Sequence, residues 1–357
     1  MSGSRVYRVP AAGEGTGRSA GRSPERLLLV SPAFHGYHRS IAAAWAQQGF
    51  DVHVHCYDDY ATLGMKLRNK GLIELPQKAG IDRSAARVAW DTRRAVAAVR
   101  EVRPQRVLVI KGDSLGEDFW TEVRGLQVPV MLWLYDDLHR HDYSMDFLRE
   151  VGPVLSYARS EADELAAQGV DAHCLPNGFD PKMPLPEVPR TGELVFVGSR
   201  YPNRVELLER LHAAGVPVRA YGRQWSRHPV DRLRTWELRR PEVPSERDIP
   251  LAEAYAVQAA AAGAVNIHGL QAGHAMRTFE VPGMGGLQLV DRDDVAEFYE
   301  PGTEVLVFHD ADELVELGRR IVADPAWGAS IREAGRRRSH AEHTFAHRAR
   351  MAQEWWA

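Results

Sequence analysis

Residues 175–193 read LPNGFDPKMPLPEVPRTGE and divide the chain into two halves of similar pattern. This stretch carries five prolines and the pair Asn177-Gly178, residue types that favour turns and linkers over helices and strands. On both sides of it, short apolar runs alternate with longer amphipathic segments, a pattern typical of parallel strands connected by helices. The sequence therefore predicts an α/β protein built from two successive doubly wound domains.

The expected strands are apolar throughout rather than alternating, so both faces of each sheet should be covered by helices. Before the proline-rich stretch we expect strands at 27–31, 52–57, 106–110, 130–135, 153–157 and 172–176, with helices at 38–48, 84–102 and 160–168. After it we expect strands at 194–198, 217–221, 264–268, 287–291 and 305–309, and a helix over 330–357. Such sheets bind ligands at the carboxyl ends of their strands, so the chemistry should lie in the loops after them.

The composition is that of a soluble globular protein, with 44% hydrophobic and 26% charged residues. A length of 357 residues suits two domains of roughly 150 residues each. The net charge of -3, without a basic run interleaved with aromatics, disfavours a nucleic acid polymer as partner. Cys56 and Cys174 indicate neither a disulfide framework nor a cysteine metal site. The oligomeric state is left open.

The N-terminus and the longest apolar run of the first half bear on localisation. Residues 1–25 are rich in Gly, Ser, Ala and Arg and lack the apolar core of a secretory signal, so we expect a flexible tail. The run VPVMLWLY at 128–135 is far shorter than the roughly 20 residues that span a bilayer. We therefore expect a cytoplasmic protein without an integral membrane segment.

The loop after the first strand, SPAFHGYHR at 31–39, lacks the G-x-G-x-x-G fingerprint of dinucleotide-binding folds, which disfavours an NAD-linked oxidoreductase. Its single Gly36 lies between His35 and His38. One interpretation is a tight strand-to-helix turn with surface histidines. The other is that Gly36 lets backbone N–H groups at the helix start approach a phosphate or a sugar.

Two acidic motifs also follow expected strands. In WLYDDLHRHD, residues 133–142, adjacent side chains point to opposite faces, so only one of Asp136 and Asp137 should reach a ligand. That carboxylate would act as a general base or hold a sugar hydroxyl, or else cap a helix. The motif fits no established metal spacing. In VDRDD, residues 290–294, we expect Asp293 or Asp294 to cap the next helix rather than bind a metal.

Basic residues follow expected strands of the second half. FVGSRYPNR, residues 196–204, places Gly198 and Ser199 at a strand end and Arg200 and Arg204 four residues apart at the start of a helix. Arginines at this position oppose the helix dipole. Either an anionic ligand such as a pyrophosphate neutralises them, or they form a solvated surface pair.

The stretch HAMRTFEVPGMGG at 274–286 follows the loop after another strand and places Arg277 three residues before Glu280. One interpretation is an ion pair on an exposed helix face. The other is a nucleotide clamp in which Arg277 binds a phosphate and Glu280 accepts hydrogen bonds from the ribose hydroxyls. The glycines at its end would let a ligand or another part of the chain come close.

Seven stretches together resemble the GT-B glycosyltransferases, in particular the group related to the spore-maturation protein CgeB, which is similar to the family 4 enzymes. They occur in the family's order and read VPVMLWLYDD, LPNGFDP, FVGSRYPNR, AYGRQW, NIHG, MRTFEVPGMGG and AGRRRSHAEHTFAHR. The resemblance implies two Rossmann-like domains that face each other across a cleft, with the donor nucleotide sugar held mainly by the C-terminal one. It implies a tail at 1–25, an N-terminal acceptor-side domain at 26–182, a linker at 183–192, a C-terminal nucleotide-sugar-binding domain at 193–338, and a last helix at 339–357 that packs back on the N-terminal domain.

By motif position, Glu280 resembles the glutamate that holds the donor ribose, and Arg200 and Arg204 resemble the basic residues on the diphosphate. The donor-binding residues expected on this resemblance are Gly36, Ser199, Arg200, Arg204, Gly222, Trp225, His268, Arg277, Thr278 and Glu280. The catalytic residues expected in the N-terminal domain are Asp137 and His35. The resemblance implies neither a metal nor a cofactor, since basic side chains and helix dipoles can stabilise the leaving diphosphate.

Two positions depart from the family. Asp136 stands where family 4 enzymes often have the histidine of a His-Asp pair, and Ala272, eight residues before Glu280, stands where they have the first glutamate of an E-x7-E pair. Retention of configuration therefore does not follow from the sequence. We expect a glycosyltransferase that uses a UDP-, dTDP-, GDP- or ADP-sugar on an unidentified small-molecule or glycan acceptor. The alternatives are a nucleotide-sugar epimerase of the same fold and an inactive nucleotide-sugar-binding protein.

Overall fold

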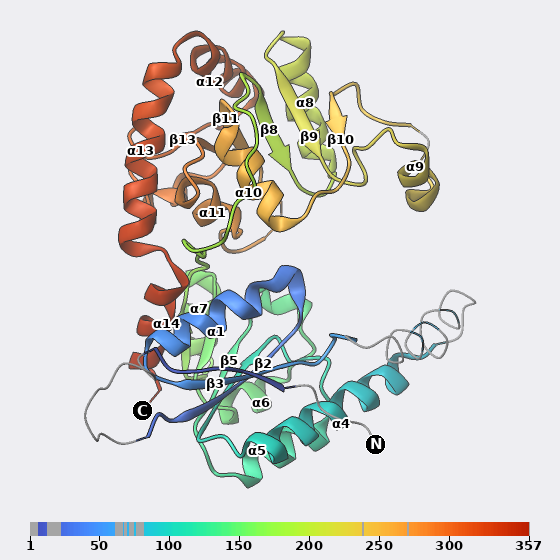
Figure 1. The fold of residues 1–357 in the computed structure, drawn as a ribbon, viewed down its shortest axis with the longest axis vertical. Helices are drawn as coiled ribbons and strands as arrows, with labels where there is room; N and C mark the ends of the chain where they lie inside the picture. Colours follow the sequence, from blue (N-terminus) through green and yellow to red (C-terminus); the bar gives the residue numbers. More distant parts are fainter. Residues whose placement is uncertain are drawn as a thin grey trace. The chain divides into compact units, whose positions relative to one another are not determined.

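The chain forms two compact α/β units in the computed structural model, which describes residues 6–12, 23–60, 67, 70, 75, 82–237, 239–269 and 271–356 (Figure 1). Unit 1 consists of Met1–Pro176 and Phe345–Ala357, and unit 2 of Asn177–Thr344. Each unit has its own sheet with helices on both faces. The prediction of two doubly wound α/β domains is confirmed.

The sheet of unit 1 has seven strands among the described residues, in the order β1-β3-β2-β4-β5-β6-β7. All neighbours are parallel except β1 and β3. Its strand order changes direction between β2 and β4, which makes the carboxyl ends of these two strands a topological switch point. The strands are β1 Val6–Val9, β2 Arg26–Ser31, β3 Asp51–Cys56, β4 Arg106–Ile110, β5 Val130–Trp133, β6 Val154–Ser156 and β7 Ala172–Cys174.

β1 lies within the predicted flexible tail, and that prediction is wrong for these residues. The strand pairs antiparallel with β3 from Val6 opposite His55 to Val9 opposite Val52. Its backbone hydrogen bonds cover the edge of β3, which would otherwise be open. A four-residue strand followed by a Gly- and Ser-rich segment gives too weak a local signal, so only the pairing with β3 identifies it.

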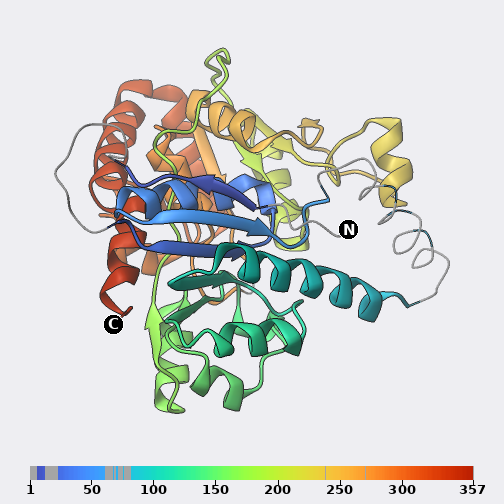
Figure 2. The same ribbon diagram turned by 60° about the horizontal axis from the view of Figure 1, so that its bottom comes forward.

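Helices cover both faces of the sheet in unit 1 (Figure 2). α4 (Ser84–Val102) and α5 (Glu117–Gly125) pack together over Val107 and Val109 of β4. α1 (Tyr37–Gln47) and α14 (Phe345–Glu354) pack together on the other face, over Leu108. Successive residues of a strand point to opposite faces, so one apolar strand serves both layers. The shorter elements of this unit are η1 Phe34–Gly36, η3 Leu138–Arg140, α6 Met145–Glu150 and α7 Arg159–Ala167.

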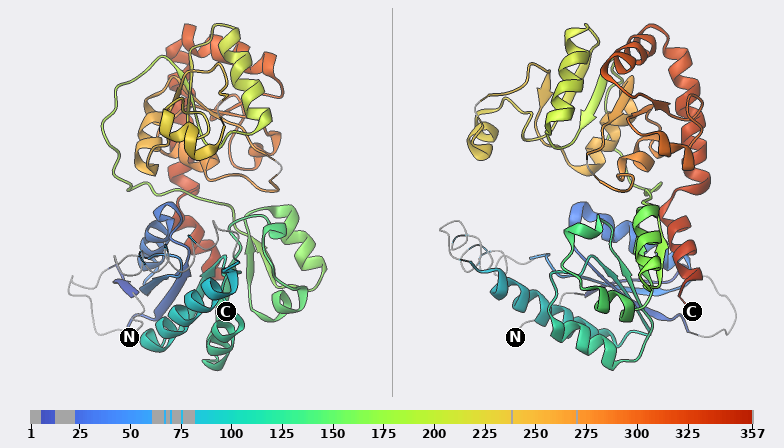
Figure 3. Two further views of the ribbon diagram at one scale, coloured as in Figure 1. Left: turned by 90° about the vertical axis from the view of Figure 1, so that its right-hand side faces the viewer. Right: turned by 180° about the vertical axis from the view of Figure 1, so that it is seen from behind.

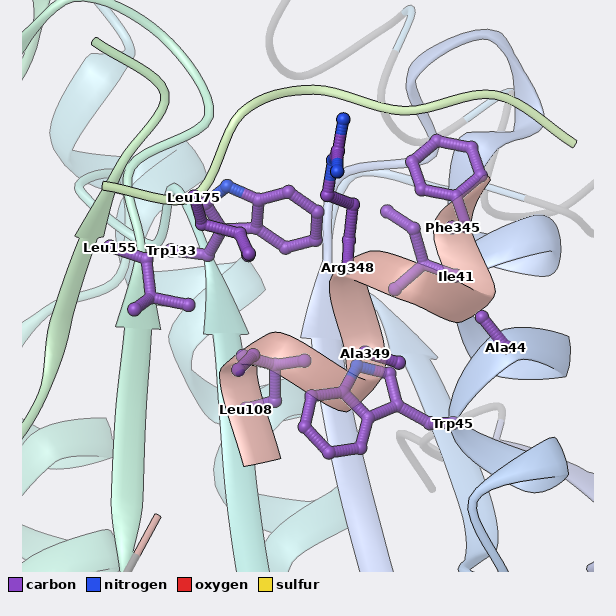
Figure 4. Close-up of a pocket in the computed structure, with 11 residues that line it drawn as sticks. Ile41, Ala44, Trp45, Leu108, Trp133, Leu155, Leu175, Phe345, Arg348 and Ala349 are labelled. Carbon is purple, nitrogen blue, oxygen red and sulfur yellow. The ribbon is translucent and has the colours of Figure 1, made fainter. Parts of the chain in front are cut away.

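α14 is held on unit 1 by close apolar packing (Figure 4). Phe345 lies beside Ile41 of α1, Arg348 stands between Phe345 and Trp133 of β5, and the gap that they line leaves no room for a water molecule. Beyond α14, the ring of Trp356 packs edge-on against Trp45, 5.1 Å between centroids, and its carbonyl accepts a hydrogen bond from Arg106 Nη1 at 2.7 Å.

The C-terminal stretch 330–357 is not one helix, contrary to the prediction. α13 (Pro325–Glu342) ends before His343, and Thr344 forms a parallel β-bridge with Phe179 before α14 begins. The backbone N–H of Phe179 donates to the His343 carbonyl at 3.2 Å. The break thus depends on a segment far away in the sequence, which helical periodicity does not report.

The sheet of unit 2 has six strands among the described residues, all parallel, in the order β10-β9-β8-β11-β12-β13. This is the 3-2-1-4-5-6 order of a Rossmann fold, with its switch point between β8 and β11. The strands are β8 Leu194–Val197, β9 Val218–Tyr221, β10 Ser245–Glu246, β11 Gly263–Asn266, β12 Gln288–Val290 and β13 Leu306–Val307.

The helices of unit 2 lie on both faces of its sheet (Figure 3). They are α8 Pro202–Ala213, α9 Pro229–Thr235, α10 Leu251–Ala260, α11 Arg277–Gly283, α12 Ala311–Ala323 and α13, with the short turn η4 at Asp293–Glu297. The largest core cluster gathers around β8 and includes Phe196, Leu208 and Leu314. None of the described helices in either unit has both the length and the hydropathy that a membrane span requires.

The segment after Pro176 is fastened to unit 2. Phe179 is fully buried, and a Cβ placed on Gly283 of α11 would stand 2.6 Å from its ring. The Asn177 amide nitrogen donates to the His274 carbonyl at 3.0 Å. The structural division therefore falls before the predicted domain end at residue 182, and at the far end it falls after the predicted limit at residue 338.

Candidate functional site

The candidate site lies where β8 and β11 end, at the switch point of the sheet in unit 2. Gly198 and Ser199 follow β8, and Ile267 and His268 follow β11. Doubly wound sheets bind ligands at this place because the loops diverge there and leave strand ends accessible. The predicted donor residues grouped around this point are Ser199, Arg204, His268, Arg277 and Thr278.

Arg204 of α8 joins the two strand ends. Its Nε and Nη2 donate to the Ile267 carbonyl at 3.0 and 2.7 Å, and its Nη1 donates to the Ser199 carbonyl at 3.0 Å. The guanidinium lies over the ring of Tyr201, 4.8 Å from its centroid, and the residue is 4% exposed. Arg204 is therefore buried and bound to backbone, and its predicted contact with a diphosphate stays a prediction.

Arg277, the first residue of α11, brings a second guanidinium to the same place. Its Nη1 lies 3.5 Å from the point where a Cβ on Gly198 would stand. Burial and the positive charge of Arg277 lower the pKa of Arg204 to about 10. Two neighbouring guanidiniums raise the free energy of the site, and an anion between them would lower it.

His268 is fixed by Asp291, the residue after β12. Its backbone N–H donates to both carboxylate oxygens, at 3.0 and 2.9 Å, and its Nδ1 lies 2.7 Å from Oδ1. Burial lowers the pKa of His268, so the ring is neutral at pH 7 and donates its proton from Nδ1. Nε2 is left as an acceptor facing the Ala275 N–H and the Thr278 hydroxyl, each at 3.4 Å.

Arg292, which the sequence analysis did not single out, holds the loop between β11 and α11. It donates from Nη1 to the carbonyls of Gln271 and Gly273 and from Nη2 to that of Ala272, each at 3.1 Å. Its Nε donates to Asp294 at 2.8 Å. At Ala272, where the family's first glutamate would stand, the loop carries no carboxylate, and its backbone oxygen is bound to Arg292.

His274 lies beneath this loop and is 6% exposed. Its Nε2 lies 3.0 Å from Asp294 Oδ1, and its Nδ1 lies 3.4 Å from the Thr278 hydroxyl. Burial lowers the pKa of His274 to about 4. The Thr278 hydroxyl also accepts a hydrogen bond from the Asn266 amide at 3.2 Å. This network of neutral His274, Thr278 and Asn266, with the Asp294 carboxylate at its edge, fixes the start of α11 against β11.

Glu280 of α11 is 3% exposed, so the interpretation as an exposed ion pair with Arg277 is wrong. Its Oε1 accepts a hydrogen bond from the hydroxyl of Tyr255 on α10. Tyr255 was not predicted from the sequence. Its position in the apolar helix LAEAYAVQAA could have indicated it, because a buried tyrosine hydroxyl needs a hydrogen-bond partner. A ribose would have to reach a carboxylate that the structure covers, and the ribose contact of Glu280 stays a prediction.

Gly222 and Trp225 shape the turn after β9. A Cβ on Gly222 would stand 2.8 Å from the Gly198 carbonyl oxygen, which only glycine avoids. Trp225 is 1% exposed, belongs to the core cluster around β8, and donates from Nε1 to the same oxygen at 3.0 Å. Both residues therefore position Gly198 beside Arg277, and the indole presents no open face to a nucleotide base.

Arg200 forms an ion pair with Glu237. Its Nη2 lies 2.5 Å from Glu237 Oε2, which also accepts a hydrogen bond from Arg240 Nη1 at 3.0 Å. The interpretation of Arg200 and Arg204 as a solvated surface pair is thus wrong, since Arg204 is buried. Arg200 would have to leave Glu237 to bind a diphosphate, and that role stays a prediction.

The predicted residues of unit 1 lie at the carboxyl end of β2. Gly36 has a left-handed φ of 84° and is the N-cap of α1. His35 is exposed, and its ring packs edge-on against Phe34, 4.6 Å between centroids. The loop is thus a tight turn that places a surface histidine beside the switch point between β2 and β4. The roles of His35 in catalysis and of Gly36 in donor binding stay predictions.

Asp137 lies after β5 and is fully buried, with its Oδ1 accepting a hydrogen bond from the Tyr157 hydroxyl. Asp136 is the more accessible of the two, at 30% exposure, and its Oδ2 lies 3.1 Å from Lys111 Nζ. Adjacent carboxylates do point in different directions, as expected from the strand. The structure covers Asp137 and leaves Asp136 at the surface, so a catalytic role of Asp137 stays a prediction.

The carboxylates of the two acidic motifs bind other side chains. Within the part of the chain that the structure describes, no group of three or more His, Cys, Asp or Glu side chains could hold a metal ion. In VDRDD, Asp293 lies 2.8 Å from His309 Nε2 and Asp294 binds Arg292 and His274. The capping prediction for these residues is wrong, because the N-cap of η4 is Arg292 and no side chain caps it.

Sequence comparison relates the C-terminal half to known proteins. Residues 200–354 match a family described as glycosyl transferase-like. The spore protein CgeB of Bacillus subtilis (strain 168) is 27% identical over 135 residues, which cover 36% of this chain and 42% of CgeB. The matched region therefore spans less than half of that relative.

Solved structures resemble the chain over most of its length. Sucrose-phosphate synthase from Thermosynechococcus elongatus has a TM-score of 0.62 at 16% identity, covering 93% of this chain and 98% of the other. HepE of Anabaena, solved in complex with UDP-glucose, has a TM-score of 0.60 at 12% identity, covering 92% and 98%. These likenesses establish the GT-B fold. The chain therefore has the GT-B fold, and its C-terminal part is similar in sequence to a glycosyl transferase-like family and to CgeB.

Proposed function

We propose that the chain transfers a glycosyl group from a nucleoside-diphosphate sugar, bound by unit 2, to an acceptor hydroxyl or amine. The observation that carries the proposal is the pair of guanidiniums of Arg204 and Arg277 at the switch point of unit 2, beside Gly198. A diphosphate would bring negative charge to the two guanidiniums. The UDP-glucose bound by HepE, a protein of the same fold, supports this class of donor.

The proposed reaction is a single substitution at the anomeric carbon of the donor sugar. The acceptor oxygen or nitrogen attacks the anomeric carbon, the bond from that carbon to the diphosphate oxygen breaks, and the acceptor gives up its proton. Negative charge develops on the departing nucleoside diphosphate, where Arg277 is placed to stabilise it and the buried charge of Arg204 adds to the field. We assign these arginines the role that a metal has in other transferases, and turnover should persist in EDTA.

We infer that a base from unit 1 takes up the proton of the acceptor. His35 is exposed at the carboxyl edge of that sheet, and Asp136 is partly exposed there, while Asp137 is covered. We therefore favour His35 among the two predicted catalytic residues. A His35→Gln variant that keeps donor affinity and loses turnover is the expected result, and unchanged turnover would remove His35 from the mechanism.

Turnover with and without acceptor tests the proposed reaction. UDP-, dTDP-, GDP- and ADP-sugars are incubated with the protein and a panel of monosaccharides and amines, and released nucleoside diphosphate is measured. Release that depends on an acceptor is the expected result. Interconversion of the donor sugar without an acceptor would establish an epimerase instead, and donor binding without release under any condition would establish an inactive binding protein, consistent with Ala272.

A further inference from the structure

The connection between β9 and β10 carries an exposed apolar surface. α9 lies within this connection and stands away from the sheet of unit 2 (Figures 1 and 3). Val230, Leu233 and Trp236 are 48, 66 and 86% exposed, and we call these three residues the α9 patch. Val230 and Leu233 are three residues apart on α9 and lie on the same side of the helix, and Trp236 follows directly after its last residue.

Trp236 occupies a position at which a large side chain is unusual. It is the C-cap of α9 and has a left-handed φ of 54°, a conformation that favours glycine or asparagine. The indole is not packed in the protein interior, because the residue is 86% exposed. A large aromatic side chain kept at a backbone position that disfavours it, and kept in solvent, indicates a contact outside the chain.

The charges around the α9 patch are mostly positive. Residues 222–241 contain six arginines and only two acidic residues, Asp231 and Glu237. Asp231 is buried and binds Arg247 at 2.8 Å, and Glu237 binds Arg200 and Arg240. Both carboxylates are thus engaged. Among the described residues, the exposed side chains of Arg227, Arg234 and Arg239 form no ion pair.

We propose that the α9 patch docks on an anionic lipid surface. Apolar side chains bordered by arginines are the composition of elements that lie in the headgroup region, with the apolar groups inserted and the cations on the phosphates. Tryptophan suits that depth because its ring is apolar and its N–H is polar. A second copy of the chain fits less well, because a two-fold contact through the patch would bring both sets of arginines together.

Docking would orient the candidate site of unit 2. Glu237 adjoins Trp236 in the sequence and binds Arg200, which follows the end of β8. The lipid-facing segment and the edge of the site are therefore joined by one ion pair. The proposal does not depend on sugar transfer, because a vesicle-binding measurement needs neither donor nor acceptor.

Vesicle co-sedimentation tests the proposal with the full chain. Binding is measured to vesicles of phosphatidylcholine with phosphatidylglycerol and to vesicles of phosphatidylcholine alone, for wild type, Leu233→Ser, Trp236→Ser and the control Val322→Ser. Val322 is an exposed apolar residue of α12, at 38% exposure. We expect binding to the anionic vesicles that weakens with salt, and a loss of at least about ten-fold for each patch variant and none for the control.

The variants change exposed residues, and thermal unfolding checks that each is folded before its binding is compared. Replacing both Arg234 and Arg239 with Gln should reduce the preference for anionic vesicles while leaving the apolar contribution. No binding of the wild type to anionic vesicles, or equal binding of the patch variants and the control, would overturn the proposal. A wild-type dimer that becomes monomeric in Leu233→Ser, without vesicle binding, would overturn it in favour of self-association.

Discussion

Arg204→Met should destabilise unit 2 although it removes a buried charge. Methionine keeps an apolar stem and deletes the guanidinium, which lies over the rings of Tyr201 and Phe196 and joins the ends of β8 and β11. Two opposing effects decide the outcome. The variant loses the hydrogen bonds to the Ser199 and Ile267 carbonyls, and it gains the free energy that burial of the charge had cost.

The magnitudes favour the hydrogen bonds. Three hydrogen bonds from a charged donor contribute about 1.5–3 kcal/mol each, or about 4.5–9 kcal/mol together. A pKa lowered from 12.5 to about 10 means that burial and Arg277 disfavour the charged form by about 3 kcal/mol. The difference is a net loss of roughly 3 kcal/mol, within a range of about 1–6 kcal/mol.

Urea unfolding followed by tryptophan fluorescence measures this difference. The matched control is Arg219→Met on β9, whose side chain is 30% exposed and pairs with Glu193 and Glu246; losing these partly exposed ion pairs should cost about 1 kcal/mol or less. A lower midpoint for Arg204→Met than for the control supports the account. Stability equal to or above wild type would refute it, because the cost of burying the charge would then exceed the hydrogen bonds.

Two further variants test the packing around α11. His274 has its pKa lowered to about 4 by burial, so below its usual pKa of 6.5 the unfolded chain takes up a proton that the folded one excludes. This costs the folded state about 3 kcal/mol between pH 6.5 and 4, and His274→Gln should remove that part of the acid destabilisation in urea titrations; an unchanged pH dependence would contradict it. Gly283→Ala should cost about 1–3 kcal/mol because its Cβ would press on Phe179, whereas the control Gly125→Ala, with open space around it, should cost nothing; equal midpoints would contradict this.

The fold was largely predictable because its signals are local. Apolar runs such as LLLVS and RVLVI are buried on both faces, and the helices between them follow from periodicity over a few turns. β1, β10 and the break at His343 were missed because each depends on a distant partner, as Thr344 depends on Phe179. Short elements of this kind acquire their stability from tertiary pairing, to which propensity contributes little.

The sequence indicated which side chains gather at the switch point of unit 2, but not how far each of them is exposed. His268 follows β11, and Arg204 and Arg277 lie near the starts of the helices α8 and α11, so the parallel strands bring all three to one edge of the sheet. Whether such a side chain is open to a ligand depends on packing, which is why Trp225 and Arg204 are buried despite their motif positions. Arg292 and Tyr255 were missed, because a residue that acts on backbone carbonyls or on a neighbouring carboxylate leaves no motif of its own.

Calorimetric titration of nucleoside diphosphates tests the central claim, that unit 2 binds them at the switch point through Arg277. UDP, dTDP, GDP and ADP are titrated into wild type, Arg277→Gln and the control Arg336→Gln, an exposed residue of α13. The account predicts that at least one of them binds and that Arg277→Gln alone weakens it about ten-fold or more. No binding across the panel, or equal affinity for all three proteins, would contradict it.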